Sequence, residues 1–201
     1  MFWKRRKKGM RPELAEPEEL LKISRKYFLQ KGKSYIVEDP SAAISYDIFV
    51  NLLSTEVGGV RLRGYIVSRQ HPNLLRKHFG LTETPITWLA TQAGENSLDP
   101  TSLGMLTHSI VDFFNKTENS IVLLDGVEYL ITNNDFRKVV RILEQINDAV
   151  MHFKGRLMVP IDPRAFDMKE LAILERYFEV ISPKRGIKGF PELQKFKKIE
   201  R

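Results

Sequence analysis

The sequence of 201 residues contains no cysteine. Disulfides, thiolate metal ligands and thiol nucleophiles are therefore excluded. No apolar run comes near the roughly 20 residues that a membrane-spanning helix needs, and no signal-peptide core is visible. These absences predict a soluble, cytoplasmic protein whose stability depends on one apolar core.

Patterns that bind metals or supply nucleophiles are equally sparse. The four histidines, His71, His78, His108 and His152, are scattered, and no two lie four residues apart, the spacing that places two ligands on one helix face. A G-x-S-x-G nucleophile elbow is also absent. We therefore predict no metal, no cofactor and no catalytic residue.

A phosphate-binding turn of the form G-x-x-x-x-G-K-[ST] is missing as well. Its place would be the turn after the first expected strand, residues 34–38, which reads Asp39-Pro-Ser-Ala-Ala-Ile-Ser-Tyr-Asp47. This turn has no glycine and no lysine, and Pro40 has no amide proton to offer a phosphate. The pair Gly58-Gly59 comes after the helix expected near 47–55 and is interpreted as the stop signal of that helix. The sequence thus predicts that no nucleotide binds here.

The sequence does contain a regular alternation of strand and helix patterns. Strands are expected at 34–38, 64–68, 86–90, 120–125, 156–160 and 178–182, and helices near 47–55, 73–79, 101–116, 134–153 and 167–177. Such alternation predicts an α/β fold with three layers, in which a mainly parallel sheet is flanked by helices. We expect this domain to span residues 34–183, preceded by a basic segment and a helix near 17–28 within residues 1–33, and followed by a basic tail, residues 184–201.

The strand Ser120-Ile-Val-Leu-Leu-Asp125 is apolar at every position before its final acid, as expected of a central parallel strand. Asp125 then lies at the edge of the sheet where open α/β folds bind ligands. The polar residues expected to gather along this strand-end rim are Glu38, Asp39, Arg69, His71, Asp125, Glu128 and Asp162.

Two interpretations of the rim acids are open. Asp125 and Glu128 can act as a magnesium ligand and a general base. Alternatively, the acids stabilise the turns after their strands by accepting hydrogen bonds from nearby groups. We favour the second interpretation, because no phosphate-binding group accompanies the acids. Arg69 is expected to pair with Asp39 or Asp125, and Trp88 is assigned to the core.

The net charge of +7 is concentrated at the two ends of the chain. Residues 1–9 and residues 184–201 each sum to +5, so the segment between them is mildly acidic at −3. Two large aromatic residues, Phe2 and Trp3, stand directly before the first basic run. The basic ends suit the phosphates of nucleic acid or an anionic membrane surface, and the second case would make the protein peripheral to a membrane. The candidate contacts are Trp3, Lys4, Arg5, Arg6, Lys7, Lys8, Lys184, Arg185, Lys195, Lys197 and Lys198.

Five segments together resemble the archaeal family known as domain of unknown function 835. They are Tyr35-Ile-Val-Glu38, Gly64-Tyr-Ile-Val-Ser-Arg-Gln-His-Pro72, Ile86-Thr-Trp-Leu89, Leu123-Leu-Asp-Gly-Val-Glu-Tyr-Leu-Ile131 and Val159-Pro-Ile-Asp-Pro163. The resemblance covers about residues 34–178. The order of elements is also similar to that of RecA and KaiC ATPases whose nucleotide-binding turn has been lost. The resemblance implies a fold and carries no established activity.

These observations favour a non-catalytic, RecA-like module that binds another protein in signalling or regulation, using the rim and the helix after Asp125. One alternative is a protein associated with nucleic acid or the ribosome through its basic ends. A second alternative is a magnesium-dependent hydrolase that uses Asp125 and Glu128. The sequence leaves the oligomeric state open.

Overall fold

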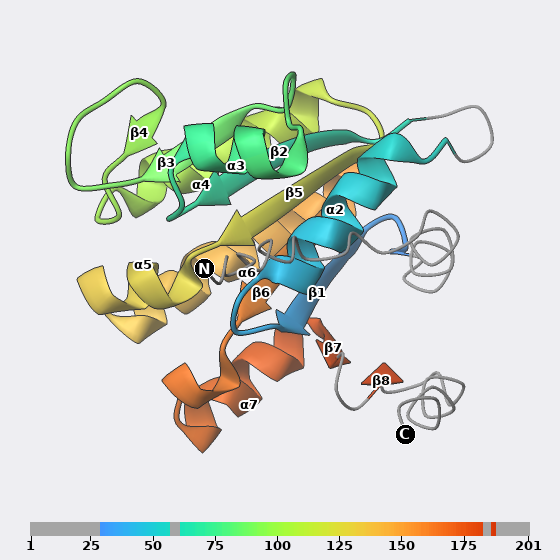
Figure 1. Ribbon diagram of the computed structural model, residues 1–201. Coiled ribbons are helices and arrows are strands. Elements are labelled where there is room, and N and C mark those ends of the chain that lie inside the picture. Colours follow the sequence, from blue (N-terminus) through green and yellow to red (C-terminus); the bar gives the residue numbers. More distant parts are fainter. Residues whose placement is uncertain (1–28, 57–60, 183–185, 188–201) are drawn as a thin grey trace, which may run out of the picture.

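The computed structural model describes residues 29–56, 61–182, 186 and 187. These residues form one eight-stranded sheet with helices on both of its faces (Figure 1). The strands are β1 (Lys33–Glu38), β2 (Arg63–Ser68), β3 (Ile86–Leu89), β4 (Ser97–Leu98), β5 (Ser120–Asp125), β6 (Arg156–Ile161), β7 (Glu179–Ser182) and β8 (Gly186–Ile187). The helices are α2 (Ala43–Ser54), α3 (Pro72–Phe79), α4 (Leu103–Lys116), α5 (Val127–Asn133), α6 (Phe136–Phe153), the 3₁₀ turn η1 (Pro163–Ala165) and α7 (Met168–Tyr177).

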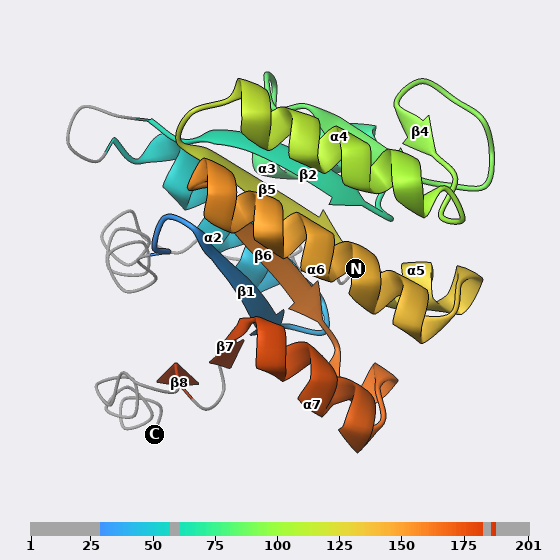
Figure 2. The same ribbon diagram turned by 180° about the vertical axis from the view of Figure 1, so that it is seen from behind.

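The sheet order is β4-β3-β2-β5-β6-β1-β7-β8. All pairs are parallel except β7 with β8, which is antiparallel. Helices α2 and α3 cover one face (Figure 1), and α4, α6 and α7 cover the other (Figure 2). The expected α/β fold with three layers and a mainly parallel sheet is confirmed, and its strand order is consistent with a RecA-like arrangement.

Between their end residues the central strands β5 and β6 are apolar at every position, because helices cover both faces of the sheet. In β5, Val122 and Leu124 pack in the core under α4 and α6, while Ile121 and Leu123 pack in the core under α2 and α3. Every residue of β6 is buried as well. The two cores hold the strands in register, so the carboxyl ends of β1, β2, β5 and β6 meet at one edge.

Helix α6 is the longest of the described helices and covers the middle of one face. Its buried residues Val139, Leu143, Ile146 and Val150 recur at intervals of three and four, which places them on one side of the helix. The Asp135 carboxylate accepts a hydrogen bond from the Arg137 amide and caps the first turn. A continuous apolar stripe on α6 thus packs against the face of the sheet that α4 and α7 also cover.

Several boundaries differ from the sequence predictions. Helix α2 begins at Ala43, four residues before the expected start, and the separate helix α5 precedes α6. A short strand, β4, lies between β3 and α4, where no strand was expected. Strand β8 adds to the sheet beyond residue 183.

Some expectations concern residues outside those described: the helix near 17–28, the Gly58-Gly59 stop signal, the basic residues 1–9 and, apart from residues 186 and 187, the basic tail 184–201. Of the helices in residues 29–56 and 61–182, none is long and apolar enough to cross a membrane.

Candidate functional site

The turn between β1 and α2 occupies the place where a phosphate-binding loop would lie. It spans residues 39–42, and Asp39 is buried with 4% of its surface exposed. The Asp39 carboxylate accepts hydrogen bonds from the Ser45 amide at 2.8 Å and from the Ser45 hydroxyl at 3.0 Å. A helix N-terminus attracts anions through such free amides. Here the amide of the third residue of α2 is already bonded to the chain's own carboxylate.

Asp125 lies beside this turn, at the end of β5. Its Oδ2 atom accepts hydrogen bonds from the Tyr46 hydroxyl at 2.9 Å and the Ser68 hydroxyl at 2.8 Å. Burial raises the pKa of the Asp125 carboxyl above its ordinary value of 3.8, and the nearby charge of Asp39 raises it further. These bonds join α2, β2 and β5 at the rim.

Tyr46 connects this network to the apolar core. Its ring stacks on Phe79 of α3 at a centroid distance of 4.7 Å. Burial raises the pKa of the Tyr46 hydroxyl, as does the charge of Asp125, so Tyr46 acts as a hydrogen-bond donor. Sequence reasoning missed both Tyr46 and Ser68. For Ser68 alone there was a usable signal, because its hydroxyl lies at the end of a strand, at the same edge of the sheet as Asp125.

A second pair of rim acids lies between α5 and β6. The Glu128 Oε1 atom accepts a hydrogen bond of 2.7 Å from the Asp162 amide, and burial raises the pKa of the Glu128 carboxyl. The Asp162 carboxylate caps η1 through the Arg164 amide and forms an ion pair of 2.7 Å with the Arg164 side chain. Further along the edge, Glu38 accepts a hydrogen bond from the Ser182 hydroxyl on β7.

Arg69 is not paired with a rim acid, so that expectation was wrong. Within the described ranges it forms no ion pair; its guanidinium lies over the ring of Tyr129 at 4.5 Å and donates to the Leu89 carbonyl at 3.3 Å. Asp39 and Asp125 already accept hydrogen bonds from hydroxyl groups. The exposed cation therefore stacks on an aromatic face instead.

Two more aromatic rings lie next to Arg69. The Trp88 indole donates to the Arg69 carbonyl at 3.1 Å, and the His71 ring contacts Trp88 edge-on at 4.8 Å. His71 also caps α3 by accepting a hydrogen bond from the Asn73 amide. Trp88 is half-buried, which corrects its assignment to the core. We call Arg69, His71, Trp88 and Tyr129 the rim cluster.

The strand ends thus bring Asp39 and Asp125 close to each other, and Glu128 close to Asp162. Within residues 29–56 and 61–182, no three acids or histidines are arranged to hold a metal ion. All candidate phosphate contacts lie outside the described residues; they fall within residues 3–8, 184–185 and 195–198.

Comparison with known proteins identifies a family for this chain. No curated protein matches the sequence. The model of the family described as protein of unknown function (DUF835) matches residues 47–178, which is more than half of the chain. The matched segment runs from α2 to the end of α7 and contains Arg69, His71, Trp88, Asp125, Glu128, Tyr129 and Asp162. The chain therefore belongs to the DUF835 family.

Proposed function

We propose that this protein is a non-catalytic, RecA-like module of the cytoplasm that binds another protein in signalling or regulation. Its contact surface is the rim cluster at the carboxyl edge of the sheet. The observation that carries the proposal is the turn after β1, where Asp39 bonds to the Ser45 amide that would otherwise attract a phosphate. With this amide occupied, the edge that binds nucleotides in related folds is available for a different ligand.

The hydrogen bonds of the rim acids support a structural role for these residues. Asp125 accepts bonds from Tyr46 and Ser68, and Glu128 accepts one from the Asp162 amide. Both hydroxyl donors meet on Asp125 Oδ2, so this oxygen links α2 and β2 to the end of β5 through two hydrogen bonds. These contacts favour the interpretation that the rim acids stabilise the ends of the strands.

The rim cluster has the composition of a protein contact site. Tryptophan, tyrosine and arginine are the residue types that dominate binding energy at protein interfaces. Arg69 and His71 are exposed, and Trp88 and Tyr129 are half-buried. The stacking of Arg69 on Tyr129 and the hydrogen bond from Trp88 to the Arg69 carbonyl hold these side chains in place before a partner arrives. Such preorganisation lowers the entropic cost of binding.

The test is a quantitative pull-down from native extract with the full chain as bait. We expect Arg69→Ala and Tyr129→Ala each to reduce recovery of the partner by about tenfold or more, the loss typical of a hot-spot residue. The matched control is Arg63→Ala, which removes an exposed arginine at the opposite end of β2. Recovery that is unchanged by both rim variants would reject the proposal.

The charge of the chain ends favours the alternative of binding to nucleic acid, because residues 1–9 and 184–201 each sum to +5. A phosphate-driven complex weakens steeply with salt, whereas an apolar protein contact barely changes. The same pull-down, repeated after nuclease treatment and between low and moderate salt, separates the two. Loss of all partners on nuclease treatment would support this alternative over the rim cluster.

A further inference from the structure

A cleft lies between the start of α2 and α3, on the face of the sheet that Figure 1 shows. Its volume is about 490 Å³, within the range of about 300–1,000 Å³ typical of ligand sites. The lining residues on one side run from Gln70, just before α3, to Phe79 at the end of that helix. This α2–α3 cleft therefore follows the whole length of α3, and the rim cluster does not contribute to its lining.

The apolar part of the α2–α3 cleft is open to water. Leu74 lines the cleft and is 63% exposed, whereas the neighbouring Leu75 is buried in the core. Phe79, which also lines the cleft, is held in place by stacking on Tyr46 at a centroid distance of 4.7 Å. An exposed leucine beside a fixed aromatic pair is apolar surface that a partner can cover.

The charged residues that line the α2–α3 cleft are basic. Lys77 and His78 come from the last turn of α3, and no aspartate or glutamate is among the lining residues. Burial raises the pKa of the nearby Asp47 carboxyl and the charge of His78 opposes that rise, so His78 is partly neutralised. Asp39, at the start of α2, is buried and directs its carboxylate to Ser45. Lys77 forms no ion pair within the described ranges, so its charge is available to a ligand.

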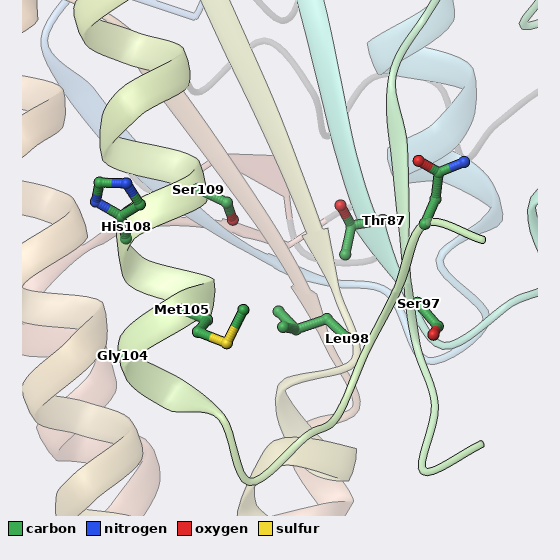
Figure 3. A pocket seen from close by; sticks show the side chains of 8 residues that line it. Thr87, Ser97, Leu98, Gly104, Met105, His108 and Ser109 are labelled. Atoms are coloured by element: carbon green, nitrogen blue, oxygen red, sulfur yellow. The ribbon is translucent and has the colours of Figure 1, made fainter. Parts of the chain in front are cut away.

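A smaller cleft, between α4 and the β3–β4 edge of the sheet, lacks this combination (Figure 3). There Met105 extends from α4 toward Leu98, and His108 is the one titratable residue of the lining. Met105 is 66% exposed, close to the value for Leu74. The cleft in Figure 3 thus has an apolar residue of similar exposure and no lysine, which makes Met105 a matched control.

We infer that the α2–α3 cleft binds an acidic segment of a partner protein, in which an aspartate or glutamate stands next to a large apolar side chain. The apolar side chain packs on Leu74 and Phe79, and the carboxylate pairs with Lys77. Helix α3 has eight residues and is about 12 Å long, which matches about two turns of a helix or about four residues of extended chain.

The shape of the cleft favours a chain segment over an enclosed small molecule, because the cleft is as long as α3 and its apolar part is open to water. Amphipathic segments dock in such grooves through apolar anchors flanked by charges. The inference goes beyond the proposed function, since it concerns a surface other than the rim cluster.

The test begins with a selection of random peptides of about eight residues, displayed on phage, against the immobilised full chain. One enriched peptide is synthesised with a fluorescent label, and its Kd is measured by anisotropy. Leu74→Ala removes the apolar contact, and Lys77→Met removes the charge but keeps most of the side chain. The controls are Met105→Ala, in the cleft of Figure 3, and Lys138→Met, at an exposed position of α6. Equal thermal midpoints establish that each variant folds.

We expect the enriched peptides to combine aspartate or glutamate with leucine, isoleucine or phenylalanine. Lys77→Met should raise the Kd by up to about fivefold, the upper value for an exposed ion pair, and this effect should vanish at high salt. Leu74→Ala should raise the Kd by about tenfold, because less apolar surface is removed from water. Met105→Ala and Lys138→Met should leave the Kd unchanged.

The inference is overturned if the enriched peptides are basic or uncharged, if nothing is enriched over the bare support, or if Leu74→Ala and Lys77→Met leave the Kd unchanged. A Kd that rises in Arg69→Ala instead places the peptides on the rim cluster, which supports the proposed function and rejects the cleft. A dimer in sedimentation velocity that Leu74→Ala dissociates would assign the cleft to a second copy of the chain, and this too would overturn the inference.

Discussion

Replacing Asp39 tests whether its carboxylate stabilises the turn after β1 by accepting the hydrogen bonds of Ser45. The Asp39 carboxylate is buried and accepts two hydrogen bonds from Ser45, which is itself fully buried. Asp39→Ala removes the acceptor and leaves both Ser45 donors without their partner. Hydrogen bonds to charged groups contribute about 1.5–3 kcal/mol each, and part of this is offset because no charge has to be buried in the variant. We expect a loss of about 2–3 kcal/mol in the free energy of unfolding.

Asp39→Asn separates geometry from charge. The amide oxygen of asparagine can accept the same two hydrogen bonds, so we expect a smaller loss of about 1 kcal/mol, from the weaker neutral bonds. The assay is urea unfolding of the full chain, with equal m-values taken as evidence that the unfolded states are comparable. Glu118→Ala is the control, because Glu118 is exposed in the turn before β5. A loss below about 0.5 kcal/mol for Asp39→Ala, within the range of ordinary surface substitutions, would refute the reasoning.

Two further predictions concern stability. Since burial raises the pKa of Asp125 above 3.8, the folded state binds more protons than the unfolded state just above this pH, and stability declines as pH rises through the folded pKa. Asp125→Asn removes this titration, so its stability relative to the wild type should rise between pH 4 and pH 7.5 in urea unfolding; an equal difference at both pH values would contradict the assignment. Gly64→Ala should cost about 1–3 kcal/mol through overpacking, because the added Cβ would lie 2.6 Å from Phe49 and 2.9 Å from Leu53. Gly104→Ala is the matched control, because Gly104 lies in the first turn of α4 with open space around it; this variant should be neutral or stabilising by up to about 1 kcal/mol. Both variants are measured by thermal unfolding. Similar losses of stability in the two would argue against the packing explanation.

The fold was accessible from sequence because its main signals are local. The run Ser120 to Asp125 identifies a strand covered on both faces without knowledge of its neighbours. The same holds for α6, where the apolar stripe and the Asp135 cap lie within one segment. The order of strands across the sheet, in contrast, depends on which helices cover which face, and the periodicity of single elements does not encode it.

The contacts of the site were less accessible because they join distant residues. Tyr46 and Asp125 are separated by 79 positions, and nothing near either residue indicates the other. The start of α2 was misplaced for a related reason. Its N-cap, Ala42, makes no side-chain bond and adopts a φ of 56°, while the carboxylate that bonds to the first turn comes from Asp39. A helix without a capping side chain at its N-cap gives little sequence signal.

The neighbours of β1 have a consequence for the order in which the sheet can be completed. Strand β1 is the first described strand in the chain, yet it lies between β6 and β7, with Lys33 beside Arg156 and Tyr35 beside Glu179. A ribosome makes both neighbours only after most of the domain. The apolar segment from Tyr35 to Val37 therefore has no native hydrogen-bonding partner strand until most of the described domain has been synthesised. Strand β1 therefore joins the sheet only when β6 and β7 are there to pair with it on either side, so the first and the last parallel strands of the domain become stable together.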